Sequence, residues 1–374
     1  MHKKKVCILS NGLWRGGTDT FVINLVRGLD KAKYDITVVL SISDEWLAAR
    51  EQEVIEAGAK TVRTYGITGK GIKGRLKHLY RLYKYLRVEK PDVFQTNIDL
   101  FNGPNLLIAW LARVPIRICH SHNSRQEREA SDGHNIAIDL YQKIMRWMCW
   151  QFSNRRAGCS EEALNFLFQN KWKSDPRVIV VNNGIDINNF RSGVDRQAKE
   201  LKLGLTEHYH ILSVGRLSPQ KNPIMIAKNF IELCKRRNDC DLIWVGIGEM
   251  KDEIQELLRQ ENVIDKVHFL GIRDDVNELM QISDLFLFPS LFEGLGIVLI
   301  EAQAAGVPCL VSDTVPPIVD CGGCKFFSIE KQSFEWAKQM ELIIDKKTKV
   351  TIDEDLLQAF SIEHMVKQME TLFS

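Results

Sequence analysis

The segment DLFLFPSLFEGLGIVLIEAQAAG, at residues 284–306, constrains the fold of this chain more than any other. An apolar run is followed by a proline, a loop rich in glycine and aromatic residues, and then an apolar helix. This order is typical of the strand–loop–helix unit of a parallel α/β sheet. Glu301 lies inside the helix, where a carboxylate is costly to bury without a partner, and Glu293 lies eight positions earlier in the loop.

The loop of this segment has the features of an anion site. Gly294, Leu295 and Gly296 precede the helix, so that backbone N–H groups gather at its positive end. The two carboxylates add acceptors for hydroxyl groups. The segment therefore predicts a site for a ligand that carries both phosphate and hydroxyls.

The rest of the chain alternates short β-branched runs with helical stretches, which predicts parallel sheets covered by helices on both faces. We expect strands at 4–10, 35–40, 60–64, 92–96, 116–121, 155–159, 178–182, 210–214, 240–245, 266–270, 284–288 and 308–311. A chain of 374 residues is long enough for two such domains. Ligands of these folds bind at the carboxyl ends of the strands.

A turn signal at Asn182–Gly184 and a polar stretch at 184–208 predict the domain boundary. We expect one Rossmann-like domain at 1–185 and a second at 186–357, facing each other across a cleft that closes during the reaction. Residues 358–374 form an amphipathic helix without a following strand, which we expect to pack back on the first domain.

Charge is unevenly distributed along the chain. Residues 1–190 hold 29 Lys and Arg against 19 Asp and Glu, a net charge of +10, while the remainder carries −8. A basic half favours an anionic partner, either a phosphate-bearing acceptor, a membrane surface or a nucleic acid. No known nucleic-acid motif accompanies it. Nine cysteines without framework spacing fit a reducing cytoplasm, and no apolar run is long enough to span a membrane.

Three loops at predicted strand ends carry further candidate residues. Gly16 and Gly17 precede a helix and let backbone N–H groups approach a ligand, although a plain tight turn explains them equally well. In VGRLSPQKNP, Arg216 and Lys221 suit a diphosphate, or else are two surface cations. The glycines near 246 and 271 allow backbone to read a flat nucleobase, but such glycines occur in any α/β turn.

These motifs together resemble a known family. VGRLSPQKNP, the FLG near residue 270 and FEGLGIVLIEAQAAGVPCLVS, with its two glutamates, resemble the retaining glycosyltransferases of the GT-B fold, family GT4. RGGTDTFVINLVRGL resembles the glycine loop of that family, except that Asp19 replaces the commoner glutamate. NNGID resembles its interdomain turn. RICHSHNS with the C-terminal motif resembles the members that build bacterial capsular polysaccharides and exopolysaccharides.

The resemblance implies roles for individual residues. Arg216 and Lys221 would hold the donor diphosphate, Glu301 would bind the ribose and Glu293 would contact the transferred sugar. A histidine after the fifth strand would donate its backbone or ring to the sugar and acceptor, and His122 is favoured over His120 because it is nearer the strand end. Further donor contacts are expected at Gly16, Gly17, His120, Gly246, Leu270, Gly271, Gly294, Leu295 and Gly296.

The resemblance also implies catalysis without a metal or other cofactor, with retention on one face of the sugar. The sequence offers no candidate for a covalent carboxylate nucleophile. The Asp353/Asp355 pair resembles a metal motif, but helix capping explains it better. Cys321-Gly-Gly-Cys324 has redox or zinc spacing, yet it lacks a second pair and is interpreted as a glycine turn. The remaining histidines are predicted to be surface or satisfied core residues: His2, His78, His134, His208, His210, His268 and His364.

Residues 70–90 form a basic stretch with an apolar helical stripe. Such a helix binds membrane surfaces or packs as an ordinary domain helix, and the two interpretations are compatible. The stripe comprises Leu76, Leu79, Tyr80, Tyr83 and Leu86. Trp147 and Trp150 are predicted to be core residues rather than membrane anchors.

The sequence thus predicts a cytoplasmic hexosyltransferase-type glycosyltransferase at the inner face of the plasma membrane. It would move a sugar from a nucleotide-diphosphate donor, UDP-linked by preference, to a lipid-diphosphate-linked saccharide. Two alternatives stay open: a GT-B nucleotide-sugar epimerase and a catalytically silent partner subunit of another transferase. A nicotinamide dehydrogenase is disfavoured because GxGxxG is absent after the first strand.

Overall fold

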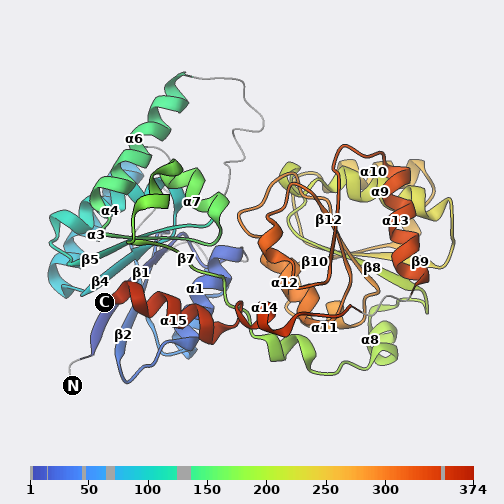
Figure 1. Cartoon of the computed structure of the whole chain (residues 1–374), viewed down its shortest axis with the longest axis horizontal. Coiled ribbons are helices and arrows are strands. Elements are labelled where there is room, and N and C mark those ends of the chain that lie inside the picture. Colours follow the sequence, from blue (N-terminus) through green and yellow to red (C-terminus); the bar gives the residue numbers. More distant parts are fainter. Residues whose placement is uncertain (1–2, 15, 44–47, 65–71, 124–135, 347–349) are drawn as a thin grey trace. The chain divides into compact units, whose positions relative to one another are not determined.

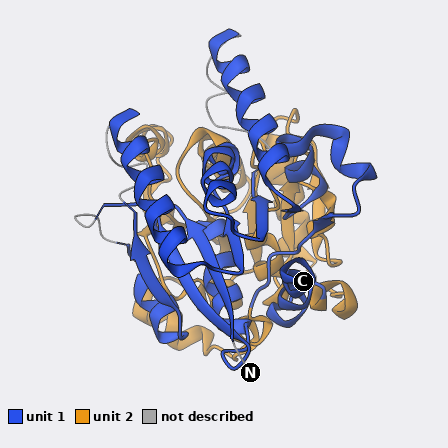
Figure 2. Cartoon of the chain, turned by 90° about the vertical axis from the view of Figure 1, so that its left-hand side faces the viewer, with its two compact units in different colours: residues 1–185, 359–374 blue, residues 186–358 orange. Residues whose placement is uncertain are grey.

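The chain divides into two compact units, residues 1–185 with 359–374 (unit 1) and residues 186–358 (unit 2) (Figures 1 and 2). The computed structural model describes residues 3–14, 16–43, 48–64, 72–123, 136–346 and 350–374. Some residues of the predicted motifs lie outside the described ones: His2, Arg15, Lys70, Gly71, Ser124 and His134.

Unit 1 contains a seven-stranded parallel sheet with the order β3-β2-β1-β4-β5-β6-β7. The strands are β1 (Lys4–Ser10), β2 (Tyr34–Leu40), β3 (Lys60–Arg63), β4 (Val93–Thr96), β5 (Ile116–Ser121), β6 (Arg155–Gly158) and β7 (Val178–Val180). The central strand β1 pairs with β2 and β4, so Val6 lies between Ile36 and Val93.

Helices cover both faces of this sheet, as successive residues of β1 show. Val6 and Ile8 face a core shared with α1, α2 and α15, whereas Cys7 and Leu9 face a core shared with α3, α4, α6 and α7. The helices are α1 (Gly17–Gly28), α2 (Glu51–Glu56), α3 (Ile72–Glu89), α4 (Asn102–Leu111), α6 (Ile136–Phe152), α7 (Glu161–Phe168) and α15 (Ile362–Phe373). The C-terminal helix α15 buries Met365, Met369 and Phe373 in unit 1.

Unit 2 contains a six-stranded parallel sheet with the order β10-β9-β8-β11-β12-β13. The strands are β8 (Tyr209–Val214), β9 (Cys240–Val245), β10 (Val267–Gly271), β11 (Leu285–Phe288), β12 (Cys309–Ser312) and β13 (Cys324–Phe327). The helices are α8 (Arg196–Leu203), α9 (Pro223–Cys234), α10 (Lys251–Gln260), α11 (Val276–Gln281), α12 (Ile297–Ala304), α13 (Ser333–Asp345) and α14 (Glu354–Gln358). Side chains of α9, α10 and α13 form a core on one face of the sheet, and α12 lies on the other (Figure 1).

The predicted α/β class with two parallel sheets is confirmed, but the sequence analysis missed strand β13. This strand has only four residues and follows directly on the Cys-Gly-Gly-Cys turn. The turn itself is as predicted: Gly322 has a φ of 96°, and the N–H groups of Cys321 and Gly323 donate to the Gln303 side-chain oxygen at 2.7 and 3.0 Å.

The apolar stripe predicted for α3 is wrong in part. The residues that α3 buries are Gly74, His78, Leu82 and Leu86. His78 faces inward because its ring has two buried polar contacts, Thr64 Oγ1 at 2.9 Å and Asn105 Oδ1 at 3.0 Å. Leu76 and Tyr80 are consequently on the outside of the helix.

The prediction that Trp147 is a core residue is also wrong, because 58% of its surface is exposed. Trp150 is half-buried, and its ring packs on Phe168 and on the guanidinium of Arg156. The two tryptophans are three positions apart on α6 and so lie on adjacent sides of the helix, of which only the side with Trp150 packs in unit 1. Among the described helices, none is long and apolar enough to cross a membrane.

Candidate functional site

Two loops at the carboxyl edge of the unit 2 sheet are joined to each other. One follows β8 and ends in a 3-10 turn at Pro219–Lys221, and the other follows β11. Gln220 connects them twice: its carbonyl accepts a hydrogen bond from the Leu291 N–H at 2.8 Å, and its side-chain amide donates to the Phe292 carbonyl at 3.0 Å. Gln220 was not among the predicted site residues. Its contacts hold the two predicted site loops in register.

The joined loops bring together Lys221 and Glu293. The ammonium of Lys221 lies 2.6 Å from Glu293 Oε1, with the two side chains 22% and 8% exposed. The same ammonium lies 4.7 Å from the ring centroid of Phe288, the last residue of β11. A cation is thus held next to a buried carboxylate and over an aromatic face, in a position to meet an anionic group of a ligand.

Arg216 lies in the same loop but points into solvent. Its side chain is 63% exposed, and its guanidinium pairs with Glu249 at 3.4 Å. Together with Lys221 and Phe288 it lines a shallow pocket at the end of β8. The exposed guanidinium is weakly held, since a surface ion pair contributes little, and it is therefore available to a ligand.

The glycines after β9 serve packing in the structure. Gly246 has a φ of 140°, and a Cβ there would lie 1.9 Å from the Gly215 carbonyl oxygen. A Cβ on Gly248 would lie 2.2 Å from the Leu217 carbonyl oxygen. Close backbone contact with the β8 loop is therefore the physical reason for both glycines. Leu270 and Gly271 end β10, and a Cβ on Gly271 would meet open space.

The loop before α12 places the remaining predicted residues of unit 2. Gly294 and Leu295 are buried, and Gly296 is the N-cap of α12 with a φ of 87°. Glu301 is half-buried in the second turn of this helix. The structure thus groups the amides of the helix N-terminus and Glu301 on one short helix.

A buried carbonyl anchors this loop to the next strand. The Ser290 carbonyl oxygen accepts hydrogen bonds from Ser312 Oγ and Thr314 Oγ1, both at 2.6 Å. These hydroxyls were not among the predicted site residues, although their place at the end of β12 and just after it is a usable signal. They position the loop that carries Glu293.

In unit 1 the glycine loop leads into α1, and Asp19 holds it in place. The Asp19 carboxylate accepts from the Gly16 N–H at 3.1 Å and from Ser10 Oγ at 3.4 Å. Burial raises the pKa of this carboxyl, while the Gly16 hydrogen bond and the charge of Arg50 act in the opposite direction. Gly16 and Gly17 themselves are exposed. The aspartate thus caps α1 by accepting from the N–H of its N-cap residue.

His120 and His122 lie side by side at the end of β5. Their ring centroids are 4.1 Å apart, and the ring of Phe21 from α1 lies 4.7 Å from His120 and 5.0 Å from His122. His120 is fully buried, and His122 is 7% exposed. The structure therefore connects both histidines to α1, the helix that begins at Gly17.

Two amides at the end of β4 set the tautomer of His122. The Asn97 amide nitrogen donates to the Leu9 carbonyl at 3.1 Å, so its Oδ1 is the atom that faces the Gln95 amide at 2.9 Å and His122 Nε2 at 3.0 Å. Because an amide oxygen only accepts, His122 Nε2 must carry the proton. Polar residues at a strand end were a signal for Gln95 and Asn97 that the sequence analysis overlooked.

The neutral His122 ring keeps one acceptor. Burial lowers its pKa to about 3, and its backbone N–H already donates to Asp99 Oδ1 at 3.2 Å. Its Nδ1 has no hydrogen-bond partner among the described residues. Both N–H groups of His122 are thus occupied. The lone pair of Nδ1 is left to accept a hydrogen bond from a ligand hydroxyl. For His120, burial and then the neighbouring His122 lower the pKa well below its ordinary value.

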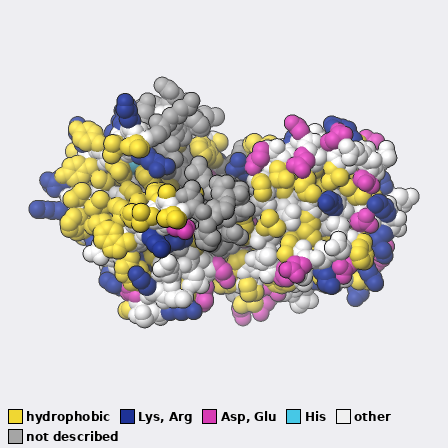
Figure 3. All heavy atoms as spheres, turned by 90° about the horizontal axis from the view of Figure 1, so that it is seen from above, with side chains coloured by type: hydrophobic (Ala, Val, Ile, Leu, Met, Phe, Trp, Pro, Cys, Tyr) yellow, Lys and Arg dark blue, Asp and Glu magenta, His cyan; other side chains and the backbone are white. Residues whose placement is uncertain are grey.

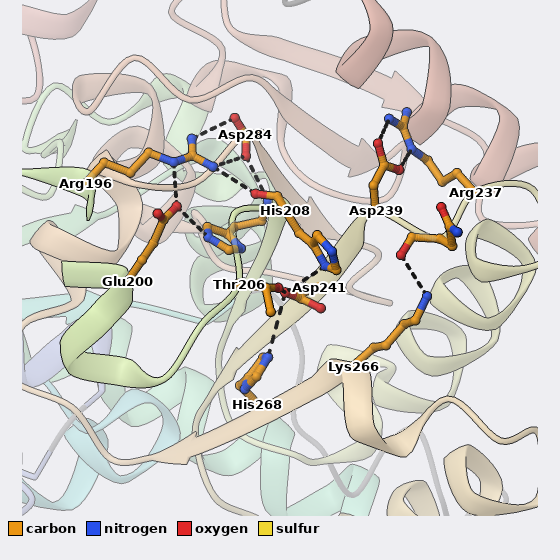
Figure 4. Close-up of polar contacts among 12 residues, drawn as sticks. Arg196, Glu200, Thr206, His208, Arg237, Asp239, Asp241, Lys266, His268 and Asp284 are labelled. Atoms are coloured by element: carbon orange, nitrogen blue, oxygen red, sulfur yellow. Dashed lines mark hydrogen bonds and ion pairs between the residues drawn. The ribbon is translucent and has the colours of Figure 1, made fainter. Parts of the chain in front are cut away.

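A second polar cluster lies at the opposite, amino-terminal edge of the unit 2 sheet (Figure 4). Arg196 pairs with Glu200 at 2.7 Å and with Asp284 at 2.9 Å, and Glu200 also contacts buried His210 at 2.8 Å. A cavity of about 610 Å³ adjoins this cluster. Because these charges satisfy one another and α/β sheets bind ligands at the other edge, we interpret the cluster as structural.

No group of three or more His, Cys, Asp or Glu among the described residues is arranged to hold a metal ion. The predicted capping role of Asp353 is confirmed, because its carboxylate accepts from the Leu356 N–H at 3.1 Å at the start of α14.

Comparison with known proteins decides the family. Residues 195–355 match the family described as glycosyl transferases group 1, and residues 15–189 match glycosyltransferase family 4. The chain is 31% identical over 323 residues to the putative glycosyltransferase EpsF of Bacillus subtilis, covering 86% of this chain and 82% of that protein. The chain belongs to the group 1 glycosyltransferases.

Other relatives of this glycosyltransferase agree. It is 28% identical over 243 residues to an Escherichia coli enzyme named UDP-Gal:alpha-D-GlcNAc-diphosphoundecaprenol alpha-1,3-galactosyltransferase, covering 64% of this chain and 62% of that one. Its fold is similar to that of HepE from Anabaena in complex with UDP and glucose, with a TM-score of 0.81, 19% identity and 99% of both chains covered. The protein is therefore a glycosyltransferase with the GT-B architecture.

Proposed function

We propose that this glycosyltransferase moves a sugar, with retention of anomeric configuration, from a UDP-linked donor to a lipid-diphosphate-linked saccharide. The observation that carries the proposal is the Lys221–Glu293 pair at the carboxyl edge of the unit 2 sheet. It supplies a cation for phosphate and a carboxylate for hydroxyls within one loop pair, which is what a nucleotide-sugar requires.

The donor diphosphate would contact Lys221 and the exposed Arg216. Both cations would stabilise the negative charge that develops on the leaving nucleotide, and the arginine suits a phosphate because its planar fork donates twice. Binding of the diphosphate would draw Lys221 away from Glu293 Oε1, and this oxygen would then accept from sugar hydroxyls. Glu301 on α12 would accept from the ribose.

Unit 1 would contribute acceptor-side groups. The exposed amides at Gly16 and Gly17 would approach the donor phosphate or sugar, and His122 Nδ1 would accept from a sugar hydroxyl. We propose reaction on one face of the sugar without a metal or a covalent carboxylate intermediate, in which the leaving phosphate assists removal of the acceptor proton. Both half-sites must act on the same donor for this reaction to proceed.

The relatives and the charge distribution support the proposed acceptor and location. The Escherichia coli relative is named for a diphosphoundecaprenol-linked acceptor, and the Bacillus subtilis relative belongs by name to the same enzyme class. A lipid-linked saccharide is held at the membrane surface, and the excess of cations in residues 1–190 fits its diphosphate. We therefore propose a peripheral enzyme at the cytoplasmic face of the plasma membrane, in capsule or exopolysaccharide synthesis.

A donor screen tests the proposal. Nucleotide release and product formation are measured with a panel of nucleotide-sugars and a lipid-diphosphate-linked saccharide, for the wild type, Arg216→Ala, Lys221→Ala and Glu293→Gln. Each variant should lose on the order of 100-fold in turnover or more. Arg259→Ala, which removes an exposed cation of α10, is the matched control and should retain activity. Unchanged turnover in the three site variants would refute the site, and an inverted product anomer would refute retention.

A further inference from the structure

Large apolar side chains are exposed along the outer side of α6 and α3 in unit 1. On α6 they recur every three or four residues, which places them in one stripe; they are Ile136, Leu140, Ile144 and Trp147. Ile136 is 86% exposed. On α3 a similar stripe comprises Ile72, Leu76 and Tyr80. Each helix therefore has a second apolar face in addition to the one that packs on the sheet.

The exposed stripes belong to one layer of helices. Helix α4 packs against both α3 and α6, and its last turn adds exposed Trp110 and Leu111. Trp110 and Trp147 both contact Phe152, with ring centroids 5.6 and 6.0 Å apart. Figure 3 shows hydrophobic side chains gathered on unit 1 with Lys and Arg among and around them. We call this the α3–α4–α6 surface. An apolar patch of this kind indicates an interaction site.

The same surface is strongly basic. Helix α3 carries six Lys and Arg against one acidic residue, Glu89. Helix α6 carries Lys143 and Arg146 against Asp139, and α4 has no charged residue. The three helices therefore have a net charge of +6. Lys84 lies 5.4 Å from the ring centroid of exposed Tyr80, so cations and apolar groups are interleaved rather than segregated.

We propose that the α3–α4–α6 surface docks on an anionic lipid bilayer, with Trp110 and Trp147 inserted at the level of the headgroups and the lysines of α3 on lipid phosphates. Tryptophan prefers the membrane interface because its ring is apolar and its N–H is polar, and cations next to inserted apolar groups bind anionic lipid. A second copy of the chain is disfavoured as the occupant, because a symmetric contact would oppose two surfaces of charge +6.

The proposal extends the basic helix predicted at 70–90 to two further helices and adds insertion to electrostatic attraction. It rests on the membrane location proposed above, but it concerns a surface outside the candidate site and is independent of the proposed chemistry. Vesicle binding is measured without donor or acceptor, so a failure of the reaction and a failure of the surface remain distinguishable.

The first test uses co-sedimentation of the full chain with vesicles. Phosphatidylcholine vesicles are compared with vesicles that contain phosphatidylglycerol, at low and high salt. The wild type should bind the anionic vesicles, and high salt should weaken the binding. Replacing Lys73, Lys77 and Lys84 by Gln should weaken it on the order of 100-fold. The same replacement at Lys202, Lys251 and Lys338, which are exposed cations of unit 2, is the matched control and should change it little.

The second test distinguishes insertion from simple adsorption. Brominated lipids should quench part of the tryptophan fluorescence of the wild type, and the double variant Trp110→Ser/Trp147→Ser should lose this quenching and bind roughly tenfold more weakly. Leu76→Ser/Leu140→Ser, at two other exposed positions, should weaken binding similarly and serves if the tryptophan variant does not fold. Absence of vesicle binding, equal binding of all variants, or a dimer in sedimentation velocity that the tryptophan variant abolishes would each overturn the proposal.

Discussion

Replacing Lys221 by Met probes the pair on which the candidate site depends. The substitution keeps most of the apolar stem over Phe288 but removes the ammonium that contacts the Glu293 carboxylate, which is only 8% exposed. We expect a loss of stability as well as a loss of turnover, because the same cation serves the empty protein and the bound donor.

The magnitude follows from the geometry. Two charges 2.6 Å apart attract by about 6 kcal/mol at an effective dielectric constant of about 20. Desolvation of the carboxylate offsets much of this, and the 22% exposure of Lys221 weakens the pair further. The net cost of Lys221→Met is therefore expected to be about 2 kcal/mol in the free energy of unfolding. Loss of one charge-stabilising donor should lower turnover by about 100- to 1,000-fold.

A double-mutant cycle measures the pair itself. Urea unfolding of Lys221→Met, Glu293→Gln and the double variant should show that the double variant loses about 1–2 kcal/mol less than the sum of the single losses. Donor turnover is compared for the wild type and these three variants. A coupling energy below about 0.5 kcal/mol would refute the buried pair, since independent sites add within that margin.

Three further outcomes follow from the structure. Gly246→Ala should destabilise the protein by about 3 kcal/mol, because its Cβ would overlap the Gly215 carbonyl. Gly271→Ala should cost only about 1 kcal/mol of backbone strain, because its Cβ would meet open space. Equal losses of the two variants in urea unfolding would contradict the packing argument. Asn97→Ala should lower turnover about tenfold and mix the His122 tautomers in nitrogen NMR spectra, whereas a purely structural role would leave the tautomer unchanged. Burial lowers the pKa of His122 to about 3 from an ordinary 6.5, so the unfolded chain binds a proton first as pH falls below 6.5. This residue should therefore reduce the free energy of unfolding by about 1.4 kcal/mol per pH unit from pH 6.5 down to about 3. The variant His122→Gln should remove that slope from the pH dependence of urea unfolding.

Strand positions were predictable because parallel buried strands are short apolar runs bounded by turn residues. The carboxyl-edge rule then selected the loops after β8 and β11, and the structure joins these two loops through Gln220. The ion pair between Lys221 and Glu293 was not predictable in the same way. The two residues are 72 positions apart, and their contact depends on the detailed path of both loops.

Helix faces were predicted less well than helix positions. Periodicity shows that a helix has an apolar stripe, but α3 and α6 each have two, and it does not tell which one packs on the sheet. On α3 the inward choice depends on His78, whose buried contacts with Thr64 and Asn105 come from distant elements. On α6, Trp147 is exposed because a different side of the helix packs on the rest of unit 1, and the sequence does not identify that side.

The roles assigned to His122 and Glu301 remain predictions that rest on chemistry and resemblance. The structure adds what the sequence could not contain, namely the tautomer that Asn97 imposes and the single acceptor left on the ring of His122. Hydrogen-bond direction requires the positions of three side chains at once, and no spacing rule supplies them.

The location of bound UDP tests the central claim most directly. In a crystal structure of the UDP complex, we expect the diphosphate against Lys221 and Arg216 at about 2.7–2.9 Å, and the ribose hydroxyls on Glu301. Lys221 should then have left Glu293. UDP bound at the amino-terminal edge beside Arg196, or at the carboxyl edge without contact to Lys221, would contradict the account.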